Sequence, residues 1–239
     1  DGFHVAVDPV DPDIVYYESQ GGRLNRLNLR SGKERNLGPV ANEGQPVFRF
    51  NWNSPFLVSP HDPTVLWLGG NHVFKLLDRG DRWEMASPDL TTMNPERMVT
   101  GGSAAETHCT IVSLAESPVA KGRLWAGTDD GKLWTSADGG AHWTDLTQNM
   151  KGVPPGLWVS RIEASHHDAA TAYVTIDGHR SNRFEPLLLV TQDAGKSWNS
   201  IVGDLPGVAP VIVIREDRAN PALLFAGTEF GIFFTLDRG

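Results

Sequence analysis

Short apolar runs separated by polar turns recur along the whole chain, and their length and alternation are typical of β-strands. Each repeat begins with a strand that ends in a turn rich in Pro or Asp, and a very apolar second strand follows. The predicted first strands are His4–Pro9, Phe56–Pro60, Thr110–Pro118, Val159–Ser165 and Val211–Asp217. The predicted second strands are Ile14–Tyr17, Val65–Leu68, Arg123–Ala126, Ala172–Thr175 and Leu223–Ala226. A glycine-bearing loop, a third strand, a polar turn and a fourth strand complete the repeat.

The polar turn before the fourth strand has its own pattern, an Asp followed by Gly two residues later and Trp five residues later. It occurs at Asp78, Asp138 and Asp193, with Trp83, Trp143 and Trp198, and it starts again at Asp237. An Asp side chain accepts hydrogen bonds from backbone N–H groups of its own turn, and Gly adopts the positive φ that such turns need. We therefore expect these Asp residues to be structural rather than catalytic, and each Trp to seal a gap beside its hairpin.

The spacing of these turns predicts the fold. Successive Asp residues are 60, 55 and 44 positions apart, which suits four antiparallel strands per repeat, as in the blades of a β-propeller. We expect an all-β chain and a single propeller segment over residues 1–239, open and partial, of about five four-stranded antiparallel blades. The expected blades are 1–48, 49–100, 101–155, 156–207 and 208–239, the last without its outer strand.

The Asp turns resemble the Asp-box, or BNR, repeats of sialidases, of certain secreted glucanases and of the receptor domain of sortilin. Further segments resemble large exported bacterial proteins described as sortilin-like or glycosyl-hydrolase BNR-repeat proteins: Asn51–Pro55, Gly69–His72, Trp158–Glu163, Asp177–Arg180 and Gly227–Gly231. The resemblance implies a multi-bladed propeller and a secreted or periplasmic location, although this sequence shows no signal peptide. It implies no particular reaction.

Composition excludes several classes of function. The net charge is −8 and Lys and Arg are not clustered, which argues against a nucleic-acid partner. No apolar run is long enough for a membrane-spanning helix. Cys109 is the single cysteine, so the chain has neither an internal disulfide nor a cysteine-based zinc site. We expect no metal and no cofactor.

Ligands of propellers usually bind where two kinds of loop meet: those between the second and third strands, and those between one blade and the next. The candidate ligand-binding residues from these loops are Trp52, Asn53, His72, Asp129, Trp158, Arg161, His179, Arg180 and Glu229. The same loops also carry Arg49, Asn51, Asn71, Glu106, Thr107, His108, Asp130 and Asp177. The set differs from repeat to repeat, as is typical of a binding surface.

Three functions remain open. The first is a non-catalytic module that binds a peptide or glycan and is joined to further blades of a longer chain. The second is a glycoside hydrolase of the glucanase type, for which the candidate carboxylates are Asp129, Asp130, Asp177 and Glu229. Asp-Gly pairs are also ordinary turn formers, so these carboxylates can equally be structural. None of the three tyrosines is placed as a sialidase nucleophile, which argues against sialidase activity. The third is a scaffold for neighbouring domains.

Two further clusters have simple structural interpretations. His166, His167 and Asp168 have the residue types of a metal site, but a polar turn explains them better. Cys109 follows His108 as in some thiol nucleophiles, although a cysteine entering an inner strand is usually a small buried side chain. Trp52 and Trp158 suit either stacking on a ligand or packing in the core.

Overall fold

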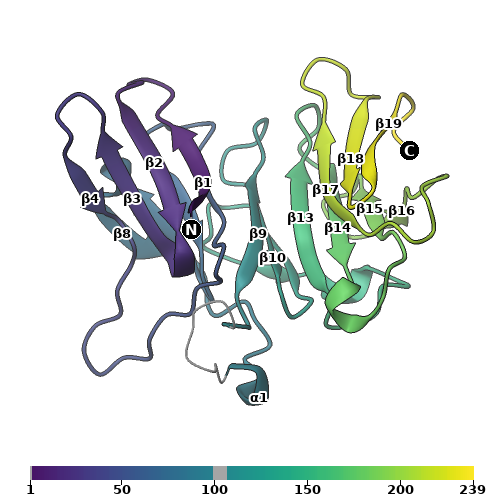
Figure 1. Ribbon diagram of the computed structural model, residues 1–239, viewed down its shortest axis with the longest axis horizontal. Coiled ribbons are helices and arrows are strands. Elements are labelled where there is room, and N and C mark those ends of the chain that lie inside the picture. The colour runs from purple at the N-terminus through teal and green to yellow at the C-terminus, as the bar shows by residue number, and fades with distance from the viewer. Residues whose placement is uncertain (1, 99–106) are drawn as a thin grey trace. The chain divides into compact units, whose positions relative to one another are not determined.

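The computed structural model describes residues 2–98 and 107–239, which form five antiparallel β-sheets and very little helix (Figure 1). The first sheet contains β1 (Gly2–Val7), β2 (Ile14–Ser19), β3 (Arg23–Asn28) and β4 (Glu34–Asn36). The second contains β5 (Phe56–Val58), β6 (Leu66–Gly69), β7 (Val73–Leu77) and β8 (Arg82–Met85). The third contains β9 (Ile111–Glu116), β10 (Leu124–Thr128), β11 (Leu133–Ser136) and β12 (Thr144–Asp145). The fourth contains β13 (Trp158–Ala164), β14 (Ala172–Asp177), β15 (Leu188–Thr191) and β16 (Asn199–Ser200), and the fifth β17 (Val211–Glu216), β18 (Leu224–Thr228) and β19 (Gly231–Thr235).

Every sheet is a meander in which each strand pairs with the next one along the chain. The expected all-β fold with four-stranded antiparallel blades is confirmed, and the fifth sheet lacks a fourth strand, as the sequence predicts. In a meander, the loop between the second and third strands lies at one end of the sheet. The turns between the first and second strands and between the third and fourth lie at the other end. Each Asp turn is therefore opposite the second-to-third loop of its own sheet.

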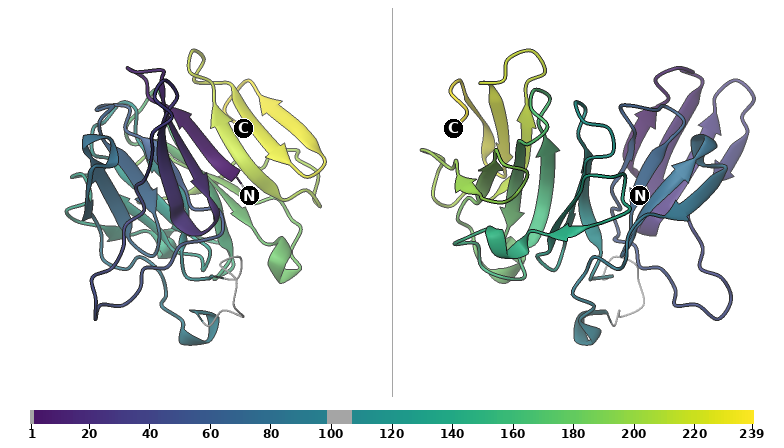
Figure 2. Two further views of the ribbon diagram at one scale, coloured as in Figure 1. Left: turned by 60° about the vertical axis from the view of Figure 1, so that its left-hand side comes forward. Right: turned by 180° about the vertical axis from the view of Figure 1, so that it is seen from behind.

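The chain divides into two compact units, residues 1–114 and 115–239. The first and second sheets belong to the first unit, drawn in purple to blue in Figures 1 and 2. The fourth and fifth sheets belong to the second unit, and β9 leads the chain from one unit into the other. The short helix α1 (Pro95–Met98) follows the second sheet. No helix in the described ranges is long and apolar enough to cross a membrane.

Apolar side chains from the second and third strands fill the space between neighbouring sheets of each unit. In the first unit, Tyr16 and Leu24 of the first sheet pack with Leu66 and Phe74 of the second. In the second unit, one cluster joins the third and fourth sheets, and the rings of Trp125 and Trp198 meet edge to face with centroids 6.1 Å apart. Another joins the fourth and fifth sheets. Face-to-face packing of this kind explains why the second strands are almost continuously apolar.

The third strand of the fifth sheet is an open edge. Ile232 and Phe234 of β19 are 80% and 66% exposed, and Leu236 beyond the strand is 66% exposed. A cavity of about 710 Å³ beside this strand is lined by apolar side chains that include Ile201 and Leu205. This open edge agrees with the expectation that the fifth blade lacks its outer strand.

Candidate functional site

The turns at Asp138, Asp193 and Asp237 share a hydrogen-bond network. In each, the network is built on a Ser or Thr that stands two residues before the Asp. The hydroxyls of Ser136 and Thr191 accept the N–H groups of Gly140 at 3.0 Å and Gly195 at 2.8 Å, respectively. Each hydroxyl also donates to the carboxylate of its Asp, and each carboxylate accepts the N–H four residues further on at 2.9 Å. Thr235, Asp237 and Gly239 repeat the first half of this pattern.

The hydrogen bonds also determine the ionisation of these carboxylates. The backbone N–H of His142 lowers the pKa of Asp138 to about 2, and the hydroxyl and N–H of Ser197 do the same for Asp193. Both carboxylates are therefore fully charged at neutral pH and occupied within their own turns. This arrangement holds the backbone, as expected for a structural role.

The turn at Asp78 is built differently, although it matches the Asp-Gly-Trp spacing. Leu76 stands where the other turns have Ser or Thr, and Asp78 itself has a φ of 54°. Its carboxylate binds the side chain of Arg82, while Arg79 forms an ion pair of 2.7 Å with buried Asp8 of the first sheet. A Ser or Thr two residues before the Asp thus distinguishes the hydrogen-bonded turns from the turn at Asp78, which has Leu76 there.

The three Trp residues of the turns differ in burial. Trp198 is 8% exposed and belongs to the core between the third and fourth sheets. Trp143 is half-buried and donates its ring N–H to Gly140 O, and Trp83 is 39% exposed. Trp198 thus fills the gap beside its hairpin as expected, whereas Trp83 is too exposed to do so.

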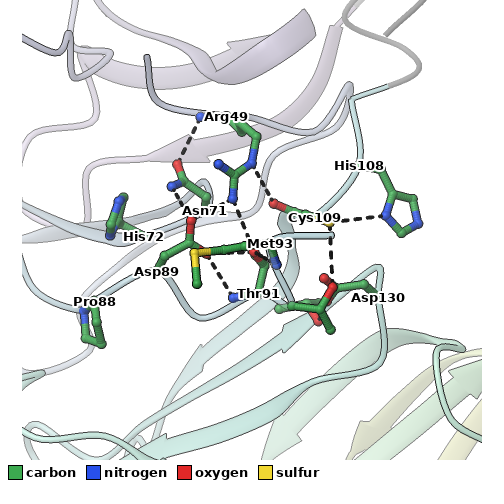
Figure 3. A network of polar contacts seen from close by, with 12 residues as sticks. Arg49, Asn71, His72, Pro88, Asp89, Thr91, Met93, His108, Cys109 and Asp130 are labelled. Atoms are coloured by element: carbon green, nitrogen blue, oxygen red, sulfur yellow. Dashed lines mark hydrogen bonds and ion pairs between the residues drawn. The ribbon is translucent and has the colours of Figure 1, made fainter. Parts of the chain in front are cut away.

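In the first unit, the loop residues around Arg49 form a closed polar network (Figure 3). The Arg49 guanidinium forms a 2.6 Å ion pair with Asp89 and donates to Thr91 Oγ1 and Cys109 O. Asn71 donates to Asp89 and accepts the N–H of Arg49. Burial raises the pKa of Asp89, but hydrogen bonds from Thr91, Asn71 and Arg49 outweigh it and keep this pKa below its usual value. These side chains fix three loops to one another.

The other expected ligand residues of the first unit are partly used in packing. His72 contacts Ser87 O through Nδ1 and packs edge to face on the rings of Phe48 and Phe74. Trp52 is half-buried, with its ring against Phe3. Asn53 is exposed. Glu106 lies outside the described residues.

Cys109 and its neighbour His108 lie at the start of the third sheet. Cys109 is buried and has a φ of 60°, with its sulfur 3.8 Å from His108 Nδ1. The burial of this thiol is consistent with the expected packing role.

In the second unit, Asp177 at the end of β14 organises the second-to-third loop of the fourth sheet. Its carboxylate, 5% exposed, contacts His179 Nδ1 at 2.6 Å and Arg180 Nη1 at 3.2 Å. The Arg180 guanidinium in turn lies 3.9 Å from the centre of the Trp158 ring. Both side chains are held by one carboxylate, and Arg180 already covers one face of Trp158.

Arg161 lies within β13 rather than in a loop, and a bulge between Val159 and Arg161 shifts the register of this strand. Its Nε is buried and has no hydrogen-bond partner among the described residues. The nearest acid, Glu163, is occupied by Arg215 at 2.9 Å and His166 at 3.4 Å. Burial, followed by the positive charge of Arg215, lowers the pKa of Arg161, whereas Glu163 only partly opposes this shift.

The remaining carboxylates expected from the sequence lie in two separate loops. Asp129 and Asp130, in the loop between β10 and β11, are 0% and 5% exposed, and Asp130 accepts the hydroxyl of Thr128. Glu229 is exposed in the tight turn between β18 and β19. Asp129 and Glu229 occupy the second-to-third loops of the third and fifth sheets, and Asp177 ends the second strand of the fourth sheet.

The His166–Asp168 segment is a polar turn. The backbone N–H of His166 and the hydroxyl of Ser165 donate to the carboxylate of Glu216, and Asp168 accepts the hydroxyl of Thr171 at 2.6 Å. His167 contacts Asp217 O. Sequence reasoning missed Glu216, a 5% exposed carboxylate that joins the fourth and fifth sheets, because an acid at the end of a strand gives no distinctive pattern.

Comparison with solved structures shows the fold that these sheets build. An ancestral GH74 enzyme matches 95% of this chain with a TM-score of 0.65 and 16% identity, and the GH74 enzyme of Niastella koreensis matches 96% with a TM-score of 0.61 and 15% identity. The extracellular domain of a B. thetaiotaomicron protein assigned as a one-component system matches 98% with a TM-score of 0.62 and 14% identity. The chain spans 27%, 33% and 27% of these three proteins. No family model and no curated sequence matches this chain.

The shared fold is therefore that of a partial β-propeller, with neighbours among GH74 enzymes and extracellular domains. At 14 to 16% identity, the likeness concerns the fold alone.

Proposed function

We propose that this protein is a non-catalytic binding module of the Asp-box (BNR) kind, exported from the cell, which holds a glycan or a peptide. The ligand would lie on the ends of the sheets opposite the Asp turns. The supporting observation is that the carboxylates there are bound within the protein or buried. The carboxylate of Asp177 contacts His179 and Arg180, and that of Asp130 accepts a hydrogen bond from Thr128. Asp129 is fully buried. What remains exposed is a varied set of polar loop side chains, which suits recognition rather than proton transfer.

Binding to an array of glycans and acidic and neutral peptides tests this proposal. Replacing Arg180 by Ala should weaken binding of any ligand found on the array at least tenfold. Lys196→Ala changes another exposed cation, in an Asp turn of the same sheet, and should leave affinity unchanged. Equal effects of both substitutions would contradict the placement of the ligand.

A glycoside hydrolase is the second candidate, favoured by the structural likeness to GH74 enzymes. Incubation of the protein with a panel of polysaccharides, followed by measurement of reducing ends, separates the two functions. Turnover that disappears in folded Asp177→Asn or Asp129→Asn variants would overturn the binding module in favour of the enzyme.

We further propose that additional blades of a longer chain cover β19. The supporting observations are the exposed side chains of Ile232 and Phe234 and the unpaired edge of the fifth sheet, since long apolar edges are usually covered. Hydrogen exchange of β19 amides in the full-length protein should be slow. Fast exchange there would contradict this proposal.

A further inference from the structure

The Asp turns of the second unit pack on the preceding sheet through their last glycine. A Cβ added to Gly195, in the turn of the fourth sheet, would lie 2.3 Å from the side chain of Leu146, which follows the last strand of the third sheet. A Cβ added to Gly239, in the turn of the fifth sheet, would lie 2.9 Å from Ile201, which follows the last strand of the fourth. The two glycines have similar φ angles of 88° and 97°. The last Asp turn therefore docks on the fourth sheet as the turn before it docks on the third.

Between the third and fourth sheets, the residue three positions after this glycine fills the core. That residue is Trp198, which is 8% exposed and meets the ring of Trp125 edge to face. It belongs to one buried cluster with the following side chains of the two sheets: Leu133, Leu146, Met150, Ile162, Ala172, Val174 and Leu189. The indole is thus part of the packing that joins these two sheets.

The same positions one sheet further along surround a cavity. Backbone pairing sets the correspondence, since Ile162 is opposite Val174 in the fourth sheet and Ile214 is opposite Ala226 in the fifth. The residue after the fourth strand also donates its N–H to the third strand in both the third and the fourth sheet. In the order used above, the corresponding residues are Leu188, Ile201, Leu205, Ile214, Leu224, Ala226 and Phe233, and all of them line the cavity of about 710 Å³. Only the tryptophan has no counterpart among the described residues.

The side chains of β19 alternate between this cavity and the outer face of the sheet. Phe233 and Thr235 are half-buried, whereas Ile232 and Phe234 are mostly exposed. Successive side chains of a strand point to opposite faces, so the half-buried pair is turned toward the fourth sheet. A further sheet stacked on the outer face covers Ile232 and Phe234. The cavity has to be filled instead from a strand that pairs with the free edge of β19, which lies beside the C-terminus in Figure 1.

We propose that a fourth strand of the fifth sheet pairs with β19 and fills this cavity with a tryptophan, three residues after Gly239 in the longer chain. This inference rests on the proposal that a longer chain covers β19, and it specifies the part that does so. The turn that directs such a strand is already formed: Gly239 N–H donates to Thr235 Oγ1 at 3.1 Å, as Gly195 N–H donates to Thr191 Oγ1 at 2.8 Å. A large aromatic side chain suits the site because the walls are apolar and protein cores are close-packed.

Extension of the intact chain tests the proposal. The segment Lys-Ser-Trp-Asn-Ser, which follows Gly195 in the fourth sheet, is added after Gly239. In one control, Lys-Ser-Ala-Asn-Ser, the ring is missing; in the other, Lys-Trp-Ser-Asn-Ser, it is moved by one residue and so turned to the outer face. The first segment should raise the Tm by about 5 °C or more relative to both controls. It should also slow hydrogen exchange of the β19 amides by about tenfold or more relative to them.

Equal effects of the three segments, or none, would overturn the proposal, because the cavity would then not select the ring. A dimer of the unextended protein that the first segment dissociates would assign the cavity to a second copy of the chain and overturn it as well. In the full-length protein, slow exchange of β19 together with a small or charged residue three positions after Gly239 would reject the tryptophan and keep the longer chain. Absence of binding to every glycan and peptide would contradict the proposed binding function and leave this inference standing.

Discussion

Glu18 is a buried group whose ionisation should affect stability. It lies near the end of β2 and is 0% exposed. One carboxylate oxygen accepts the N–H groups of Gly22 at 3.3 Å and Ser54 at 3.4 Å, and the other has no hydrogen-bond partner among the described residues. Burial raises the pKa of Glu18 to about 7, and the two backbone N–H groups only partly oppose this shift.

The sign of the effect follows from linkage. Between its ordinary pKa of 4.5 and the folded value of about 7, the folded protein holds a proton that the unfolded chain has released. The stability due to the protonated carboxyl is therefore fully present below pH 4.5 and is lost as the pH rises through 7. A shift of roughly 2.5 units corresponds to about 3 kcal/mol.

Glu18→Gln removes the charged form and keeps an oxygen that accepts the two N–H groups. We expect the variant to be more stable than the wild type by up to about 3 kcal/mol at pH 8, with little difference at pH 4.5. Urea unfolding of both proteins at several pH values from 4.5 to 8 measures this difference. Glu43→Gln, which changes an exposed glutamate of the same unit, serves as the matched control. Parallel stability curves for wild type and Glu18→Gln would refute the reasoning.

Three further predictions concern the Asp turns of the second unit. Ala194 has a φ of 61°, so Ala194→Gly should stabilise the protein by up to about 1 kcal/mol. Gly195 has a φ of 88°, and a Cβ added there would lie 2.3 Å from a leucine methyl, so Gly195→Ala should cost about 2 to 4 kcal/mol. Chemical denaturation of both variants measures these opposite effects. Trp198→Ala should cost about 3 to 5 kcal/mol by the same assay, and a loss below 1 kcal/mol would show that the ring is not part of the core. Because hydrogen bonds lower the pKa of Asp138 and Asp193 to about 2, their contribution to stability is present above pH 4 and should be lost as the pH falls from 4 through 2; the double substitution to Asn should flatten the Tm profile in that range.

The sequence predicts the strands well because the apolar second strands β6, β10 and β14 are buried on both faces. Composition alone distinguishes such segments, and β6, β10, β14 and β18 lie within a few residues of their expected positions. The fourth strands are less predictable. Only two residues pair in each of β12 and β16, which is too short for any alternation to show. The Trp residues beside them are buried to different degrees because burial depends on the neighbouring sheet.

The candidate site is less predictable for a related reason. Loop positions follow from the strand order. His179 and Glu229 do lie in second-to-third loops, and Asp177 is the last residue before one of them. Which carboxylates are occupied depends on contacts between side chains, such as the pairing of Asp177 with Arg180, that no spacing reveals.

Arg161 illustrates what the sheet register adds to the sequence. Counted by simple alternation, positions 158 and 161 fall on opposite faces of a strand, so the sequence separates Trp158 from Arg161. The bulge in β13 adds one residue and returns Arg161 to the face of Trp158. Bulges of this kind also occur in β1 and β17, the inner strands of the first and fifth sheets. A shift that recurs in the inner strands of three sheets belongs to the repeat, and it decides which side chains of each inner strand share a face.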